Sequence, residues 1–465
     1  MFRQNFQQDR FFINKNQKNV FLCLLYAYVI KNKIFIADIF VFLQNFYLFL
    51  VVFIHNSQLT IHNSMKRIRY FIFLRDVLMI ACTAFGGPQA HFAIFLKEFV
   101  EKRAYITHEQ LTELTALCTL LPGPTSTQTI TAIGYKVGGA PLAYLTLLVW
   151  IFPSVCIMTF AGVGVNYLLE NNISLAFARY MQPIAVGFVA YASLQFVQKV
   201  IKTKTAFLLM IIAACVAFIF HKPWVFPIII VVGGAITTLK FRKYPRQKDK
   251  NIQIKWRNLT YFILVFVIVG VLSEVTRQFS FGLPFRLAEN FYRTGTLIFG
   301  GGQVLIPLML TEFVQVKKLV SIEEFSSGYA FSQLVPGPTF SFAVFIGALC
   351  MREYGIGGEI LGGLIAAFGV FLPGTLLIFF VIQFWDELKK YRIVRASLEG
   401  INAASAGLVL VGFALMVLAS YQSILPINML FLNIGIIITT FLLLQFTKIP
   451  PPVLILIGFL IGIIF

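Results

Sequence analysis

The sequence has few charged residues: only 12% of its 465 residues are Asp, Glu, Lys or Arg, whereas 58% are hydrophobic. A soluble domain needs a largely polar surface, and this chain cannot supply one over most of its length. A helix that crosses a bilayer needs about 20 consecutive apolar residues. Such stretches recur from residue 68 to the C-terminus. The composition therefore excludes a soluble globular protein and predicts a membrane protein.

The sequence also lacks the common motifs of metal sites and nucleotide hydrolysis. Its six cysteines form no CxxC pair, its five histidines form no HExxH motif, and no GxxxxGK[ST] loop occurs. We therefore expect no metal, no cofactor and no ATP hydrolysis. Because no cluster of His, Asp or Cys falls at membrane depth, an intramembrane enzyme is only a remote alternative.

The net charge of +19 comes from Lys and Arg in the short connections between apolar stretches. This placement is typical of the positive-inside rule and does not indicate a nucleic-acid partner. We expect the lipid bilayer, and no nucleic acid, to be the partner of this positively charged chain.

Residues 1–64 differ from the rest, because they are rich in Phe, Asn, Gln and Lys and hold one apolar run near 34–54. At Met65 a basic cluster precedes a clean hydrophobic segment. We favour the interpretation that Met65 is the true initiator and that 1–64 is upstream translated sequence. The alternative is a genuine extra span. A cleaved signal peptide fits less well, because no small-residue cleavage site follows the apolar run.

A repeat emerges when the chain is shifted by 214 positions against itself. Residues 85–125 then align without a gap on 299–339, with 15 identities in 41 positions. The matches fall on Gly, Pro, Gln and Glu, so general hydrophobic resemblance does not explain them. We predict an N-terminal transporter repeat at 65–239, a connecting transmembrane helix at 259–284 and a C-terminal repeat at 285–465.

A basic linker at 240–258 separates the two repeats and is expected to be cytoplasmic, with eight Lys or Arg against one Asp. Seven expected crossings separate the starts of the repeats, and an odd number inverts the second one. The predicted fold is an all-α polytopic membrane protein of two inverted repeats, with about 12–13 transmembrane helices. Lys97, Lys102 and Arg103 break the charge rule. Either segment 88–105 re-enters the membrane or faces a solvent cavity, or its acidic residues balance these bases.

Each repeat carries a Pro-Gly-Pro-Thr motif inside an apolar segment. Proline interrupts a helix and restricts the residue before it, so both helices should break there. Broken backbone at membrane depth must be buried in protein or line a water-filled cavity. The half-helix after each break offers free N–H groups and a positive dipole end, which favour an anion. The alternative is a packing kink with Thr and Ser bonded back to their own helix. Because the Pro-Gly-Pro-Thr motif occurs in both repeats, we favour a role in anion binding over a packing kink.

A second motif pair contains adjacent glycines followed by Gln89 or Gln303. Such glycines let backbone approach a ligand closely, although a tight helix crossing is an equal alternative. The predicted substrate-binding residues are Gly86, Gly87, Gln89, Pro122, Gly123, Pro124, Thr125, Ser126, Gly300, Gly301, Gln303, Pro336, Gly337, Pro338 and Thr339.

Two charged pairs also match across the repeat: Glu98 with Glu312, and Arg103 with Lys317. Ionisable residues at membrane depth are rare and usually functional or paired. The carboxylates are candidates for proton coupling, and the basic residues for an anion's route into the site. The alternative is interfacial side chains that snorkel.

The two-copy pattern of Phe-Gly-Gly, Glu-x-Val and Leu-Pro-Gly-Pro resembles the chromate ion transporter family in its long, two-domain form. The resemblance covers about 70–465, and it departs from the family pattern at Ala104-Tyr105. It implies efflux of chromate through a bacterial inner membrane, driven by membrane potential or a proton gradient, and chromate resistance. Sulfate or other oxyanion uptake or exchange is the alternative, because chromate and sulfate are both tetrahedral dianions. A homodimer is a further expectation.

Overall fold

The computed structural model describes residues 64–85, 87–171, 180–220, 222, 225–239, 256–299, 304–384, 392–422, 427–447 and 449–464. The two interpretations of 1–64 and most of the basic linker at 240–258 lie outside these residues. Residues Tyr70–Phe465 form one compact unit, which is the unit described below.

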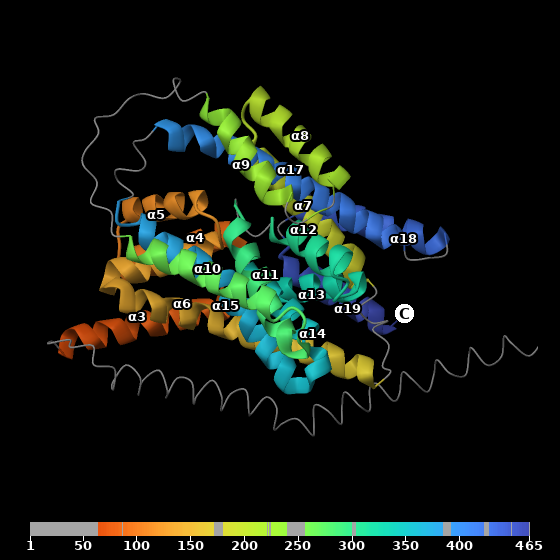
Figure 1. The fold of residues 1–465 in the computed structure, drawn as a ribbon, viewed down its shortest axis with the longest axis horizontal. Helices are drawn as coiled ribbons and strands as arrows, with labels where there is room; N and C mark the ends of the chain where they lie inside the picture. The colour runs from red at the N-terminus through yellow and green to blue at the C-terminus, as the bar shows by residue number, and fades with distance from the viewer. Residues whose placement is uncertain are drawn as a thin grey trace, which may run out of the picture. The chain divides into compact units, whose positions relative to one another are not determined.

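The described residues of the first half form helices joined by short loops (Figure 1). Its elements are α3 (Ser64–Thr83), α4 (Gly87–Phe95), the π-helical segment η1 (Leu96–Lys102), α5 (His108–Leu120), α6 (Thr125–Glu170), α7 (Met181–Val200), α8 (Lys204–Phe220) and α9 (Val225–Thr238).

The second half is likewise helical in its described residues. It begins with α10 (Arg257–Val275), η4 (Ser280–Gly282), α11 (Leu283–Leu297), α12 (Leu305–Met309), the π-helical η5 (Leu310–Val316) and α13 (Ile322–Leu334). It continues with η6 (Thr339–Ser341), α14 (Phe342–Cys350), η7 (Arg352–Tyr354), α15 (Gly355–Val381), α17 (Arg392–Gln422), α18 (Ile427–Phe446) and α19 (Pro451–Ile464).

Several helices in the described part of the chain have the length and apolarity of membrane spans. Five pass both criteria: Thr125–Glu170, Arg257–Val275, Arg352–Val381, Ala396–Leu418 and Met429–Phe446. Shorter apolar helices lie between them, including most of α8 and α9. The protein is therefore an all-α, multi-pass membrane protein, as the composition predicts.

The sequence repeat is also a repeat of local structure. Thr107 and Gln110 form a capping box at the start of α5, and Ser321 and Glu324, each 214 positions later, form another at the start of α13. The π-helical segments η1 and η5 are offset by the same 214 residues. Because caps and π-turns depend on local sequence, this agreement shows that both halves fold by the same local rules.

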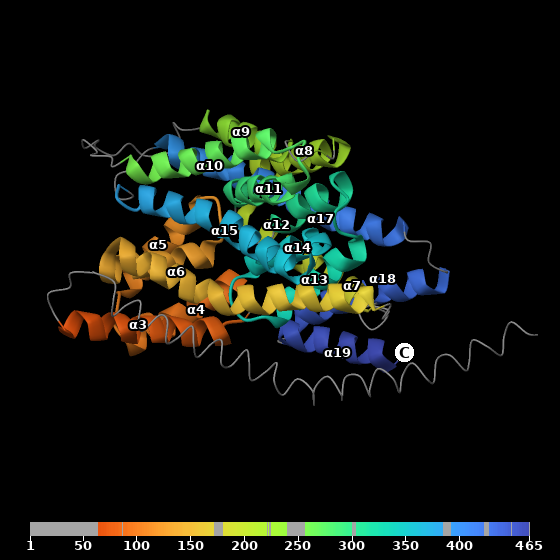
Figure 2. The ribbon, with the colours of Figure 1, turned by 60° about the horizontal axis from the view of Figure 1, so that its bottom comes forward.

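The corresponding long helices of the two repeats pack antiparallel. A glycine with positive φ lies at the kink inside α6 (Gly139, φ 73°), and another begins α15 (Gly355, φ 67°). The ring of Tyr144 packs on Phe379, and further along α6 the Thr159 side chain faces Gly363. Residue numbers thus rise along α6 while they fall along α15, and Figures 1 and 2 show the two ribbons running in opposite directions. This is the relation that an inverted repeat requires.

Helix α17 packs against α8 and α9 through small residues (Figure 2). At the crossing with α9, the Thr237 hydroxyl accepts a hydrogen bond from the Gly400 N–H over 3.1 Å. A Cβ added at Gly400 would lie 1.8 Å from the carbonyl oxygen of Gly233. Only glycine therefore permits this close crossing.

We expect Gly400→Ala to force α9 and α17 apart and to lower the free energy of unfolding by at least about 1–3 kcal/mol, the usual cost of overpacking. Gly435→Ala on α18 is the matched control, because a Cβ there meets no atom within 4 Å. Thermal denaturation of the detergent-solubilised variants checks this. Equal melting temperatures for the two would contradict the crossing.

Candidate functional site

Both predicted helix breaks are present in the structure. Helix α5 ends at Leu120 and α6 begins at Thr125, with Pro124 as its N-cap residue in an extended conformation. In the second repeat α13 ends at Leu334, and the 3-10 turn η6 begins at Thr339 and leads into α14. Proline explains both interruptions, because its ring prevents the preceding residues from continuing a helix.

The backbone of each break is bonded to the opposite repeat. The Gly123 N–H donates to the carbonyl of Ile298 over 2.7 Å, and the Gly337 N–H donates to the carbonyl of Ala84 over 2.8 Å. Ala84 and Ile298 immediately precede the two Phe-Gly-Gly motifs and are themselves 214 positions apart. Such a reciprocal exchange is what two-fold related halves produce. Each Pro-Gly-Pro motif thus meets the start of the other repeat's Phe-Gly-Gly motif at the interface between the halves.

The two glycines of the breaks have backbone conformations that other residues adopt only with strain. Gly123 has φ 121° and Gly337 has φ 103°. A Cβ at Gly123 would lie 3.1 Å from the Cα of Gly374 on α15. A Cβ at Gly337 would make an ordinary 3.4 Å contact with the Ser154 side chain on α6. Each break therefore packs against the long helix of the other repeat, Gly123 against α15 and Gly337 against α6. The packing is tighter at Gly123.

Gln128 holds the first break in place, and the sequence analysis did not single it out. Its buried side-chain amide donates to the carbonyl of Pro122 over 2.8 Å and to the carbonyl of Gly374 over 3.1 Å. It therefore ties the break both to its own half-helix and to α15. The repeat gives no signal for it, because the residue 214 positions later is Phe342.

We expect Gln128→Leu to reduce transport by about tenfold or more, because two buried carbonyls would lose their donor at about 1–3 kcal/mol each. Gln110→Ala, in the capping box of α5 that faces solvent, is the control for general damage to the same helix pair. Transport by reconstituted protein, normalised to the amount inserted, is the measurement. An active Gln128→Leu variant would remove this residue from the site.

The start of α6 is a buried polar surface. Thr125, Ser126 and Thr127 form its first turn and are all buried. No side chain caps this end, and the first main-chain bond returns only from the Gln128 N–H to the Pro124 carbonyl over 2.9 Å. The first-turn N–H groups therefore remain available for an anion, as expected for a half-helix N-terminus.

The hydroxyls near the start of α6 fall into three groups. Thr129 and Thr131 bond back to carbonyls of their own helix, as in the packing alternative. The Thr127 hydroxyl instead accepts from the Trp150 indole over 3.1 Å. Among the described residues, the Thr125 and Ser126 hydroxyls have no hydrogen-bond partner, so these two are free to contact a ligand.

The second break offers fewer polar groups. Thr339 and the buried Ser341 lie in η6, but Phe342 and Ala343 stand where the first repeat has Gln128 and Thr129. The polar lining of the site therefore comes mainly from the first repeat.

The remaining predicted substrate-binding residues belong to the Phe-Gly-Gly segments. Gly87 and Gln89 lie in the first turn of α4. Gly86, Gly300, Gly301 and Gln303 lie outside the described residues, so their predicted contacts stay predictions.

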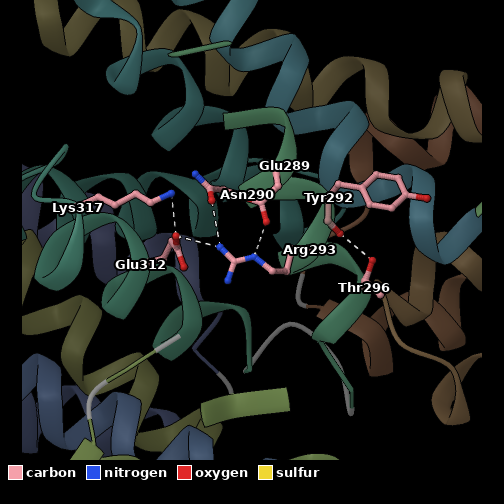
Figure 3. A network of polar contacts seen from close by, with 7 residues as sticks. All are labelled: Glu289, Asn290, Tyr292, Arg293, Thr296, Glu312 and Lys317. Atoms are coloured by element: carbon pink, nitrogen blue, oxygen red, sulfur yellow. Dashed lines mark hydrogen bonds and ion pairs between the residues drawn. The ribbon is translucent and has the colours of Figure 1, made fainter. Parts of the chain in front are cut away.

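The predicted charged residue Glu312 belongs to an ion-pair network in which Arg293 makes the most contacts (Figure 3). Its side chain is 4% exposed and is contacted by Lys317 Nζ over 2.9 Å and by a guanidinium nitrogen of Arg293 over 3.1 Å. Arg293 also binds Glu289 over 2.8 Å and Asn290 over 3.0 Å. Two cations therefore neutralise Glu312, and the network joins α11 to the π-helical segment η5.

The first repeat uses a different pair for the same connection. Arg103 binds Asp76 on α3 over 2.9 Å, and the Tyr105 hydroxyl donates to the same carboxylate over 3.0 Å. Glu98 pairs with Lys102 on a more exposed surface. The sequence analysis missed Asp76 and Arg293, although a charge inside the first apolar segment of each repeat was the available signal.

In the described part of the chain no group of three or more His, Cys, Asp or Glu could hold a metal ion. The groups free to bind a ligand are backbone N–H groups and hydroxyls at the crossing of two broken helices, while the Gln128 amide, already bonded to two carbonyls, positions the first break. Chemically, this arrangement can bind an anion by hydrogen bonds without a metal ligand set.

Comparison with known proteins agrees with this architecture. The family model described as "Chromate transporter" matches residues 71–239 and 285–463. An uncharacterized transporter of Methanocaldococcus jannaschii is 26% identical over 353 residues, covering 75% of this chain and 85% of the relative. The chromate transport protein of Cupriavidus metallidurans is 23% identical over 397 residues, covering 83% and 91%.

The probable chromate transport protein of Synechococcus elongatus is 22% identical over 393 residues, covering 83% of this chain and 93% of the relative. No solved structure matches the chain. The family model covers most of the chain and matches it twice, once in each half. This protein is a member of the chromate transporter family.

Proposed function

We propose that this protein is a secondary active transporter that exports chromate from the cytoplasm across a bacterial inner membrane and thereby confers chromate resistance. Two relatives, matched over 91% and 77% of their own lengths, are named chromate transport proteins, which supports chromate as the substrate. The observation that carries the proposal is the uncapped first turn of α6, with free N–H groups and the hydroxyls of Thr125 and Ser126, at the crossing of the repeats.

Electrostatics favours the outward direction for a dianion. The membrane potential is worth about 2.3 kcal/mol per elementary charge per 100 mV. A dianion leaving an inside-negative cell therefore gains about 4.6 kcal/mol per 100 mV, or about three orders of magnitude in concentration ratio. The potential alone can drive efflux, which is consistent with the absence of an ATP-hydrolysing motif from the sequence.

The inverted arrangement of the repeats supports alternating access. Equivalent half-helices that run in opposite directions give the site similar approaches from the two membrane faces. We propose that one repeat rocks against the other about the reciprocal bonds of Gly123 and Gly337. We propose that the anion enters past the exposed Glu98–Lys102 pair and the partly exposed guanidinium of Arg103, which is held by the buried Asp76. A homodimer stays a prediction.

Chromate uptake into everted inner-membrane vesicles tests the proposal, because everted vesicles turn efflux into uptake. We expect uptake that requires respiratory energisation and that excess sulfate reduces only in part. Pro122→Ala and Pro336→Ala should each lower it. Uptake of sulfate but not of chromate would show that sulfate is the substrate, and it would not contradict the proposed anion site. No oxyanion uptake above that of empty vesicles would overturn the proposal.

A further inference from the structure

Most buried charged side chains in the described residues have an opposite charge beside them. Asp76 pairs with Arg103, Glu312 with Lys317 and Arg293, and Glu324 with Arg352. The charge of each of these carboxylates is thus balanced within the protein by a cation in direct contact. Glu312, a coupling candidate from the sequence, is therefore better explained as part of a structural network.

Two buried titratable side chains in the same part of the chain differ from these, His91 and Glu359. Neither ring nitrogen of His91 makes a hydrogen bond of normal geometry, although the Ala84 backbone lies within reach of the ring, and one buried carboxylate oxygen of Glu359 has no partner. A buried polar group without a partner is costly, and native proteins keep such groups where a ligand, a water or a proton completes them. Of the two, His91 is the one whose neighbours belong to the candidate site.

His91 lies at the crossing of the two repeats. Its ring packs edge-on against Trp150 at a centroid distance of 5.3 Å, and the Trp150 indole donates to Thr127 in the first turn of α6. The backbone of Ala84 is close enough to interact with the ring, and the Ala84 carbonyl is the group that accepts from Gly337. His91 is thus connected through Trp150 to the first turn of α6 and through Ala84 to the second Pro-Gly-Pro break.

The surroundings of His91 contain no counter-charge in direct contact among the described residues. The ring contacts Phe95 and Trp150, and the aromatic stack continues through Phe99 to Tyr105. The charged groups that this stack reaches are Asp76 and Arg103, which neutralise each other. A proton on His91 is therefore unfavourable in the empty protein, and a bound oxyanion would supply the missing negative charge.

We propose that His91 binds one proton together with each oxyanion, so that the transporter moves the anion and the proton in the same direction. This rests on the proposed function. Binding is reciprocal: the anion favours the protonated ring, and the protonated ring strengthens anion binding. The ring takes up a proton when the anion binds and releases it when the anion leaves. The second repeat has Leu305 at the equivalent position, so one proton site is expected per chain.

Cotransport of one proton changes the charge balance of efflux. A dianion that leaves with one proton carries a single net negative charge outward, so about half of the driving force from the potential remains. The membrane potential still drives export, whereas a pH gradient with an acidic exterior opposes it. Export should therefore respond to the two gradients with opposite signs.

The test uses proteoliposomes of the full chain with a trapped pH-sensitive dye and a clamped membrane potential, at a pH where chromate is a dianion. We expect chromate influx to acidify the lumen with about one proton per anion. His91→Gln, whose amide can still hydrogen-bond but cannot titrate, should move chromate with proton flux reduced by at least about tenfold. Glu359→Gln, which removes the other unpartnered buried group, is the matched control and should keep the normal ratio.

Anion binding at several pH values provides a second readout if His91→Gln moves no chromate. Wild-type affinity should fall as the pH rises and the proton is lost, whereas the affinity of His91→Gln should stay constant. Chromate flux without proton flux in the wild type, an unchanged ratio in His91→Gln, a pH-independent wild-type affinity, or loss of coupling only in Glu359→Gln would each overturn the inference. A wild-type protein that moves no oxyanion would instead refute the transport proposal on which it rests.

Discussion

Gly123→Ala is expected to lower transport by more than tenfold, and Gly337→Ala to lower it by less. Both residues have positive φ, a conformation that costs a residue with a side chain about 1–3 kcal/mol. At Gly123 the new methyl group would also lie 3.1 Å from the Cα of Gly374. This contact is with backbone, which cannot move aside as a flexible side chain can. At Gly337 the contact would be an ordinary one with Ser154. The first break should therefore tolerate the change less well.

Initial rates of chromate uptake by equal amounts of reconstituted protein measure this difference. Gly139→Ala serves as the control, because that glycine also has positive φ but meets no atom closer than 4.0 Å and lies away from the breaks. If Gly139→Ala and Gly123→Ala behave alike, general backbone strain explains the loss and the close contact with α15 does not.

Glu312→Gln should be the most destabilising change among the charged residues. The substitution leaves Lys317 and Arg293 without the nearly buried carboxylate that both contact (Figure 3). Removing one partner of a fully buried pair costs about 3–5 kcal/mol. Because the two cations are 30% and 27% exposed, water offsets part of this cost, and about 1–3 kcal/mol is expected.

Glu98→Gln is the matched control, because it removes the equivalent carboxylate of the first repeat from an exposed pair with Lys102. Surface pairs contribute about 0–1 kcal/mol, so its melting temperature should stay close to that of the wild type. Thermal unfolding followed by size-exclusion chromatography compares the two. Equal losses at Glu98 and Glu312 would show that the network in the second repeat has no special structural role.

The parts of this architecture that depend on local sequence could be predicted. The Pro-Gly-Pro breaks, the repeat at an offset of 214 and the all-α membrane class follow from proline chemistry, motif spacing and hydropathy. The structure places the breaks between Leu120 and Thr125 and between Leu334 and Thr339.

The parts that depend on distant contacts could not be predicted in the same way. The amide of Gln128 donates to Gly374, 246 positions away, and no motif relates the two. The bonds of Gly123 and Gly337 also cross between the repeats, so a sequence comparison within one half gives no sign of them. His91 has no counterpart in the second repeat. A comparison of the two halves selects residues that they share, so it does not select His91.

Equilibrium binding of radiolabelled chromate to the purified protein tests most directly whether the first turn of α6 is the substrate site. The account predicts saturable binding that is weakened at least about tenfold by the double substitution Thr125→Val and Ser126→Ala, which removes two free hydroxyls from the site. It also predicts near-normal binding for Ser193→Ala, whose hydroxyl bonds back to Val189 within α7. Unchanged binding in the Thr125 and Ser126 variant would contradict the account and place the anion elsewhere.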